Sequence, residues 1–351
     1  MHRFHREFRD AVDELDGQLG QSGSTYSVLG LSLQDILHKE IPKIQKELSR
    51  AVAAHRHLQW KATLDDKGRA AGVLAGASAE GRRPLASEFL TCAPCTRTQT
   101  IPDVNYQILI KLRLALPVTI HGEQCKVRTQ DNPRQCNKPL TAAADHAFAC
   151  AKAARQTTHN NVADLNAQYH HEAGNRAWRE AAVPEATKTS KDKPIRADVL
   201  VRRGPIDPAE CTEVKLRHPF KSDGALQISS ANNWDNYLLA EEHAITRKYS
   251  PVRVRPWVFS TLGRPGEQFC TDLRRLARER LGRRDAQRAV SRDSLRQLLL
   301  RRWRAQISCT IATGMSNTIL DAIEGTAAGR DVTLPRETHL YDLQTYRFTG
   351  Y

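Results

Sequence analysis

The sequence predicts a mixed α/β protein with a small sheet flanked by helices and further helical regions on both sides. Short apolar or alternating segments near residues 177–185, 197–201, 212–216 and 252–261 are typical of strands. Longer segments with apolar residues three or four apart surround them, which is typical of amphipathic helices. The chain has 351 residues, enough for two or three domains with a sizeable core.

The charge of the chain favours a polyanionic partner. The net charge is +14 and the pI is about 9.6, which favours nucleic acid over a membrane surface. The eight cysteines are scattered, and no apolar signal segment precedes them, so we expect a reducing compartment and metal ligation rather than disulfides. No segment approaches the length of a membrane span. We therefore expect an intracellular protein, and a nuclear one if its partner is DNA.

The N-terminal part of the chain is predicted to be helical. Residues 1–65 carry apolar positions at helical spacing over 1–20 and again from about Ser32, and we interpret them as a packing or partner surface. Residues 66–124 form a helical linker region with a helix at about 103–116. The pair Cys92 and Cys95 lacks a second pair at zinc-finger spacing, which favours a structural role for both thiols.

Residues 125–154 contain a candidate zinc knuckle. Cys125 and Cys136 are followed by His146 and Cys150, which are four apart and share a face if this segment is helical. Three thiolates and one imidazole form a common closed tetrahedral zinc set. The alternative is a group of unliganded buried cysteines with a capping histidine.

A helix at 157–173 and a strand at 177–185 are expected to open a core domain over residues 155–262, and a long helix at about 224–248 precedes its last strand at 252–261. His159 and Asn160 fall at the expected start of the helix, where exposed amides and the helix dipole favour a phosphate. The strand carries two acidic side chains, Glu180 and Glu185.

Two short strands with a turn between them carry the residues on which a catalytic prediction rests. Asp198 begins the first, and Glu213 and Lys215 share a face of the second, so a hairpin would bring the carboxylate of Asp198 beside Glu213. Two carboxylates can hold Mg²⁺, which polarises a phosphate and lowers the pKa of bound water. A lysine can orient that water or neutralise developing charge. The alternative is a solvated hairpin with a cross-strand ion pair.

Residues 263–330 are predicted to form a basic helical region, followed by an uninformative tail at 331–351. Helices are expected at 265–281 and 291–323. Between Thr271 and Arg304 there are twelve arginines and four acidic residues. Such a surface binds phosphates without sequence preference, and we assign this role to Arg301, Arg302 and Arg304. The alternative is a solvated, partly self-paired helix surface.

The order of these motifs resembles the C-terminal region of site-specific non-LTR retrotransposon polyproteins, in which a zinc motif precedes a restriction-like endonuclease of the PD-(D/E)XK type. The resemblance covers about residues 70–325. It rests on a ligand set ending HAFAC, a His-Asn pair, Ala-Asp on a strand, an acidic residue on the next strand with His-Pro after it, a Lys-Tyr pair, and a strand ending FSTLG. The chain departs from the family at Thr158, where an arginine is usual, at Ala197, where proline is usual, and in lacking a reverse-transcriptase segment.

The resemblance implies a restriction-endonuclease-like core that nicks DNA, or RNA as a second choice, with a divalent metal. Asp198 and Glu213 would hold Mg²⁺, and the Cys125 set would hold zinc. Two lysines compete for the catalytic role: strand periodicity favours Lys215, whereas the family pattern favours Lys248 with Tyr249. Glu185 is a candidate third carboxylate, with Glu180 as its substitute. The alternatives are a nucleic-acid-binding protein with an inactive nuclease-like core, and a structural module stabilised by zinc.

Overall fold

The structure is a computed structural model of the chain, and it describes residues 73, 85, 88–91, 99–120, 122–129, 132–183, 195–204, 207–227, 234–284 and 292–325. The expected helices at the N-terminus, the Cys92 and Cys95 pair, Glu185 and the tail at 331–351 lie outside the described residues.

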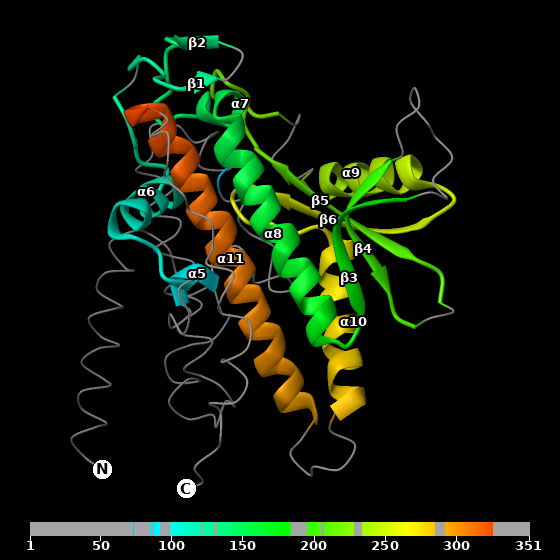
Figure 1. Cartoon of the computed structure of the whole chain (residues 1–351). Coiled ribbons are helices and arrows are strands. Elements are labelled where there is room, and N and C mark those ends of the chain that lie inside the picture. The colour runs from blue at the N-terminus through cyan, green and yellow to red at the C-terminus, as the bar shows by residue number, and fades with distance from the viewer. Residues whose placement is uncertain are drawn as a thin grey trace, which may run out of the picture. The chain divides into compact units, whose positions relative to one another are not determined.

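A four-stranded mixed sheet lies at one side of the described part of the chain (Figure 1). Its strands lie in the order β3 (Arg176–Ala182), β4 (Arg196–Arg202), β5 (Glu210–Arg217) and β6 (Arg253–Ser260). The first three are antiparallel neighbours, while β5 and β6 are parallel and are joined through helix α9 (Trp234–Tyr249). The prediction of a mixed α/β architecture is confirmed.

Helices cover both faces of this sheet. On one face, α9 packs against β6 in a core that includes Cys211, Ile245 and Val258. On the other face, the core joins Val199 and other sheet residues to α8 (Lys152–Glu172), α10 (Glu267–Arg284) and α11 (Arg292–Glu324). Figure 1 shows α9 on one side of the sheet and α8 with α11 on the other. The two basic helices therefore share a core with the strands.

The long helices α8 and α11 approach each other closely. At Gly314 of α11, a Cβ atom would lie 2.0 Å from the Oγ1 atom of Thr158 in α8, so only glycine fits this contact without displacing its neighbour. Further along, the Tyr169 ring stacks on Trp303 at a centroid distance of 4.7 Å, and its hydroxyl donates to the Trp303 carbonyl at 3.0 Å.

A smaller core lies at the far end of α11. It includes residues from α6 (Asp103–Arg113), α7 (Ala147–Cys150) and the segment around β1 (Arg128–Thr129) and β2 (Asn132–Gln135). The amide of Lys126 donates to the Ala322 carbonyl at 2.8 Å, which attaches this segment to α11. A short helix, α5 (Glu88–Thr91), also contacts α11. Within the described part of the chain, no helix combines the length and apolar character that crossing a bilayer requires.

Two predicted helix starts are wrong. The helix expected at 157–173 begins earlier, at Lys152, because the chain turns directly from α7 into α8. The helix expected at about 224–248 does not start at Gly224, and its described part is α9. Gly224 instead adopts a positive φ of +88° in a turn that Phe220 and Leu226 close with an isolated bridge.

Candidate functional site

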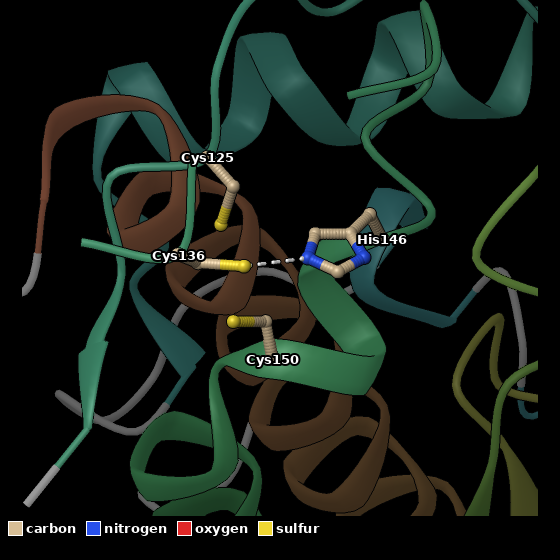
Figure 2. A group of neighbouring side chains, drawn as sticks. All are labelled: Cys125, Cys136, His146 and Cys150. Carbon is tan, nitrogen blue, oxygen red and sulfur yellow. Dashed lines mark hydrogen bonds between the residues drawn. The ribbon is translucent and has the colours of Figure 1, made fainter. Parts of the chain in front are cut away.

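Three cysteines and a histidine converge in the smaller core. The sulfur atoms of Cys125, Cys136 and Cys150 and a ring nitrogen of His146 all lie within 4.8 Å of one another. Figure 2 shows the three sulfurs and the imidazole directed toward one another. Among the described residues, this is the one group of three or more such ligands with a geometry that can hold a metal ion.

The backbone explains why the wide gap between the first two cysteines does not prevent this arrangement. The ten intervening residues include the β1–β2 hairpin, and the Cys136 amide donates to the Val127 carbonyl at 3.0 Å. The amide of Asn137 donates to the Cys125 carbonyl at 2.9 Å, so the two cysteines lie across from each other. His146 and Cys150 bracket the single turn of α7, where the Cys150 amide donates to the His146 carbonyl at 3.2 Å. Each pair therefore comes from one local element.

The cluster suits a small, thiophilic cation such as zinc. A tetrahedron with Zn–S bonds of about 2.3 Å has edges of about 3.8 Å, so the side chains need to close only slightly. The Cys136 sulfur already lies 3.2 Å from the His146 Nε2 atom. Cys125 is fully buried and His146 is 6% exposed, and four protein ligands leave no open position. Such a closed site is typical of structural rather than catalytic zinc.

Burial shapes the protonation of these ligands. It raises the pKa of the Cys125 thiol, and it raises the pKa of Cys150 to about 12 with help from the neighbouring thiols. Burial also lowers the pKa of His146, which keeps the imidazole neutral, as a metal ligand must be. A bound divalent cation would stabilise the thiolates that burial alone disfavours.

A second candidate site lies where β4 and β5 separate. Their ladder pairs Val199 with Thr212 and Leu200 with Cys211, so the same register places Asp198 opposite Glu213. The ladder ends there, and the amide of Val214 donates instead to the Oδ2 atom of Asp198 at 2.7 Å. Residues opposite each other in an antiparallel pair share a face. The two carboxylates therefore belong to one site at the opening between the strands.

His159 reaches this opening from α8. Its Nε2 atom lies 3.1 Å from Asp198 Oδ2 and 3.2 Å from the Val214 carbonyl, and Asn160 Oδ1 lies 3.3 Å from its Nδ1 atom. Burial opposes the charged imidazolium, but the hydrogen bond and charge of Asp198 outweigh it, assisted by Asn160 and by the charge of Glu213, and the pKa of His159 is raised. Because α8 begins two turns earlier, His159 and Asn160 do not form the helix-start phosphate site that the sequence predicts.

Glu213 is contacted by the last two residues of α9. The Lys248 Nζ atom lies 2.8 Å from Glu213 Oε1, and the Tyr249 hydroxyl makes a short hydrogen bond to Oε2. Burial, followed by that hydrogen bond and the Glu213 charge, raises the pKa of Tyr249 far above its usual range, so the phenol remains a donor. The Lys-Tyr pair therefore reaches the carboxylate through the packing of α9 on the sheet.

Lys215 lies near Glu213 but is held by a different carboxylate. Its ammonium group pairs with Glu241 Oε2 at 2.5 Å, and Arg217 pairs with the other oxygen of Glu241 at 2.8 Å. Glu241 lies two turns before Lys248 on α9. Sequence periodicity gave no indication of Glu241 as a competitor for Lys215.

Of the two candidates for a third carboxylate, Glu185 and Glu180, only Glu180 lies within the described residues. Its neighbours pair as Arg179 with Val199 and Ala181 with Ala197, which places Glu180 opposite Asp198. Glu180 is exposed and has a left-handed φ of +47°, a strained conformation for a residue with a Cβ atom. Arg179, which no sequence motif marked, donates to the Asp198 carbonyl at 3.3 Å and pairs with Asp164 at 2.9 Å.

The three arginines assigned to phosphate binding differ in their surroundings. Arg302 pairs with Glu172, which Arg280 also contacts at 2.5 Å. Arg304 lies 3.7 Å from a carboxylate oxygen of Glu88. Arg301 is exposed. Arg302 is therefore engaged within the protein, as the alternative of a partly self-paired surface describes.

Comparisons of the chain with models of protein families, with curated proteins and with solved structures give no match. The geometry itself defines a mixed α/β protein with a four-stranded mixed sheet and a Cys/His cluster that could hold a metal such as zinc.

Proposed function

We propose that the protein is a metal-dependent DNA endonuclease with a restriction-endonuclease-like core and a zinc knuckle. The observation that carries the proposal is the position of Asp198 and Glu213, opposite each other where β4 and β5 separate. Basic groups lie on both sides of the pair, with His159 at Asp198 and Lys248 at Glu213. Paired carboxylates beside a lysine match the requirements of phosphodiester hydrolysis with Mg²⁺.

Each side chain has a distinct role in this proposal. Asp198 and Glu213 would hold Mg²⁺, which supplies Lewis acidity at the phosphate and a water of lowered pKa. Lys248 is the better candidate for stabilising the developing charge, because it contacts Glu213 whereas Lys215 is bound to Glu241. Glu180 lies on the adjacent strand, but among the described residues it does not form a three-ligand group with Asp198 and Glu213.

The zinc knuckle would act as a structural support for this core. Asp145, next to the ligand His146, lies 3.1 Å from the Nε2 atom of His218, which follows β5. The His218 ring stacks on Phe148 of α7 at a centroid distance of 3.8 Å. Zinc bound to the cluster would thereby fix α7 against the end of the strand that carries Glu213.

One observation favours a second candidate, a nucleic-acid-binding protein whose nuclease-like core is inactive. The two carboxylates accept from four donors: His159, the Val214 amide, Lys248 and Tyr249. A metal ion at Glu213 would have to displace the Lys248 ammonium group. If that ion pair persists, the site serves the stability of the fold rather than chemistry.

Nicking of supercoiled plasmid with Mg²⁺ or Mn²⁺ separates the two candidates. The endonuclease proposal predicts nicking by the wild type, loss of nicking in Asp198→Ala with DNA binding retained, and full activity in the exposed control Asp103→Ala. Lys248→Ala should lose nicking and Lys215→Ala should retain it; the reverse would assign the role to Lys215. A wild type that binds DNA but nicks with neither metal supports the inactive core.

A further inference from the structure

A pocket of about 360 Å³ lies between α10 and α11, away from both sites described above. Its walls consist of Arg274, Arg278, Arg296, Gln297, Leu300 and Arg304. The start of α11 forms one wall, and it lies at the opposite end of that helix from α7, the helix that ends at Cys150 (Figure 1).

Helical spacing explains why four arginines face one space. Arg274 and Arg278 are four residues apart on α10, so they lie one above the other on the same helix face. Arg296, Leu300 and Arg304 repeat the same interval on α11. Leu300 is 5% exposed and supplies an apolar surface between its two arginine neighbours. Two helix faces therefore present guanidinium groups across a shared groove.

Three other arginines of this helix pair are neutralised by acidic residues. Arg275 pairs with Asp272 and Glu279, and Arg280 and Arg302 both pair with Glu172. Asp272 is 1% exposed, and Glu172 belongs to α8, which packs against this helix pair. Arginines on the packed side thus have their counter-charges within the fold.

The arginines of the pocket have much weaker neutralisation. Arg296 pairs with Asp293, whose side chain is 82% exposed, and Arg304 lies 3.7 Å from Glu88. Arg278 donates from Nε to the Arg274 carbonyl. Within the described part of the chain, neither the Arg274 nor the Arg278 guanidinium group has a carboxylate partner. Four positive charges therefore share two carboxylates, one of them at the surface.

From this imbalance we infer that the α10–α11 pocket binds a phosphate group, and that this group belongs to the backbone of a nucleic acid. Guanidinium groups bind phosphate oxygens through paired N–H donors, and several converging groups are typical of phosphate sites. Arg274, Arg278 and Gln297 are exposed, so a phosphate within a polymer can reach them. The inference that the phosphate belongs to a nucleic acid rests on the proposed function as a DNA endonuclease. The inference that the pocket binds phosphate rests on its arginines alone.

The test is DNA binding by the zinc-loaded chain, measured by fluorescence anisotropy of a short labelled duplex without Mg²⁺ or Mn²⁺ over a series of KCl concentrations. The variant is Arg274→Gln with Arg278→Gln. The control is Lys111→Gln with Lys221→Gln, which removes the same charge from exposed positions on other elements. Seating one phosphate predicts about tenfold weaker binding in the variant and a salt dependence reduced by about one counterion, with little change in the control. Equal effects in variant and control would overturn the inference.

A second measurement distinguishes the source of the phosphate. In one outcome, inorganic phosphate or pyrophosphate raises the melting temperature of the wild type but not of the variant, while the two proteins bind DNA equally well. In that case the pocket binds phosphate, but the phosphate does not belong to a nucleic acid. Because the binding assay contains no Mg²⁺ or Mn²⁺, its result is independent of cleavage. Pocket-dependent binding by a wild type that does not nick plasmid with either metal supports this inference and refutes the endonuclease. Equal melting temperatures of the wild type and the double variant without ligand show that the variant is folded. If these temperatures differ, the single variant Arg278→Gln replaces the double variant in both measurements.

Discussion

Replacement of a single ligand should abolish zinc binding and lower the stability of the protein. In Cys150→Ser, the cluster keeps Cys125, Cys136 and His146 but loses the thiolate at the end of α7. Zinc at a thousandfold excess over its dissociation constant stabilises a folded protein by about 4 kcal/mol. We expect the variant to lose a contribution of about that size, because without zinc the hairpin and α7 are no longer joined through the metal.

The raised pKa values of the thiols also predict how the zinc affinity depends on pH. Because the pKa values of Cys125 and Cys150 are both raised, these two thiols are protonated near neutral pH and must release their protons when zinc binds. The apparent zinc affinity of the wild type should therefore rise at least about a hundredfold per pH unit in that range. Competition with a chromophoric chelator at several pH values measures this slope.

The assays have a matched control in the same protein. Elemental analysis should give one zinc per chain for the wild type and for Cys270→Ser, a half-buried cysteine on α10 outside the cluster, and none for Cys150→Ser. Urea unfolding then gives the difference in stability. A wild type purified without zinc and unable to take it up, or a Cys150→Ser variant that retains zinc, would refute the assignment.

Three further predictions concern protonation and packing. Asp198→Asn should lower the pKa of His159 in an NMR titration, since burial then acts against the imidazolium without the opposing charge of Asp198. In the wild type, this contact stabilises the fold below pH 6.5 and loses that effect as the pH rises through the raised pKa. An unchanged pKa in the variant would contradict the contact. His170 is fully buried, with its pKa lowered to about 4 by burial, so stability should fall by about 3 kcal/mol as pH drops from 6.5 toward 4; urea unfolding of His170→Gln should show a weaker dependence over that interval. Gly314→Ala should cost about 2 kcal/mol, because the new Cβ would overlap the Thr158 side chain, and adding Thr158→Ala should restore part of it; independent, additive losses would show that the two positions do not touch.

The parts of the structure that the sequence predicts well depend on local periodicity. A short apolar segment predicted β4, and alternation of apolar and polar residues predicted β5. The fourteen residues between Asp198 and Glu213 allowed the antiparallel pairing that the structure shows. The four ligands of the metal cluster could also be predicted from the sequence, because His146 and Cys150 are four residues apart and therefore share a face of a helix. Its long spacing only required a hairpin between the first two ligands.

The features that the sequence did not predict depend on contacts between distant elements. Lys248 reaches Glu213 only because α9 packs across the sheet, and Lys215 is held by Glu241 for the same reason. Strand periodicity places Lys215 on the correct face but contains no information about the helix above it. The sequence likewise could not show which arginines are paired within the fold, because Glu172 of α8, which pairs with both Arg280 and Arg302, is 108 and 130 residues away from them.

The role of Asp198 and Glu213 as one metal site is tested most directly by titrating zinc-loaded protein with Mn²⁺ and recording free Mn²⁺ by electron paramagnetic resonance. We predict one Mn²⁺ site per chain in the wild type and in the control Asp103→Asn, and loss of that site in both Asp198→Asn and Glu213→Gln. Mn²⁺ binding that is absent from the wild type, or equal in all four proteins, would contradict the assignment of these carboxylates to a catalytic metal.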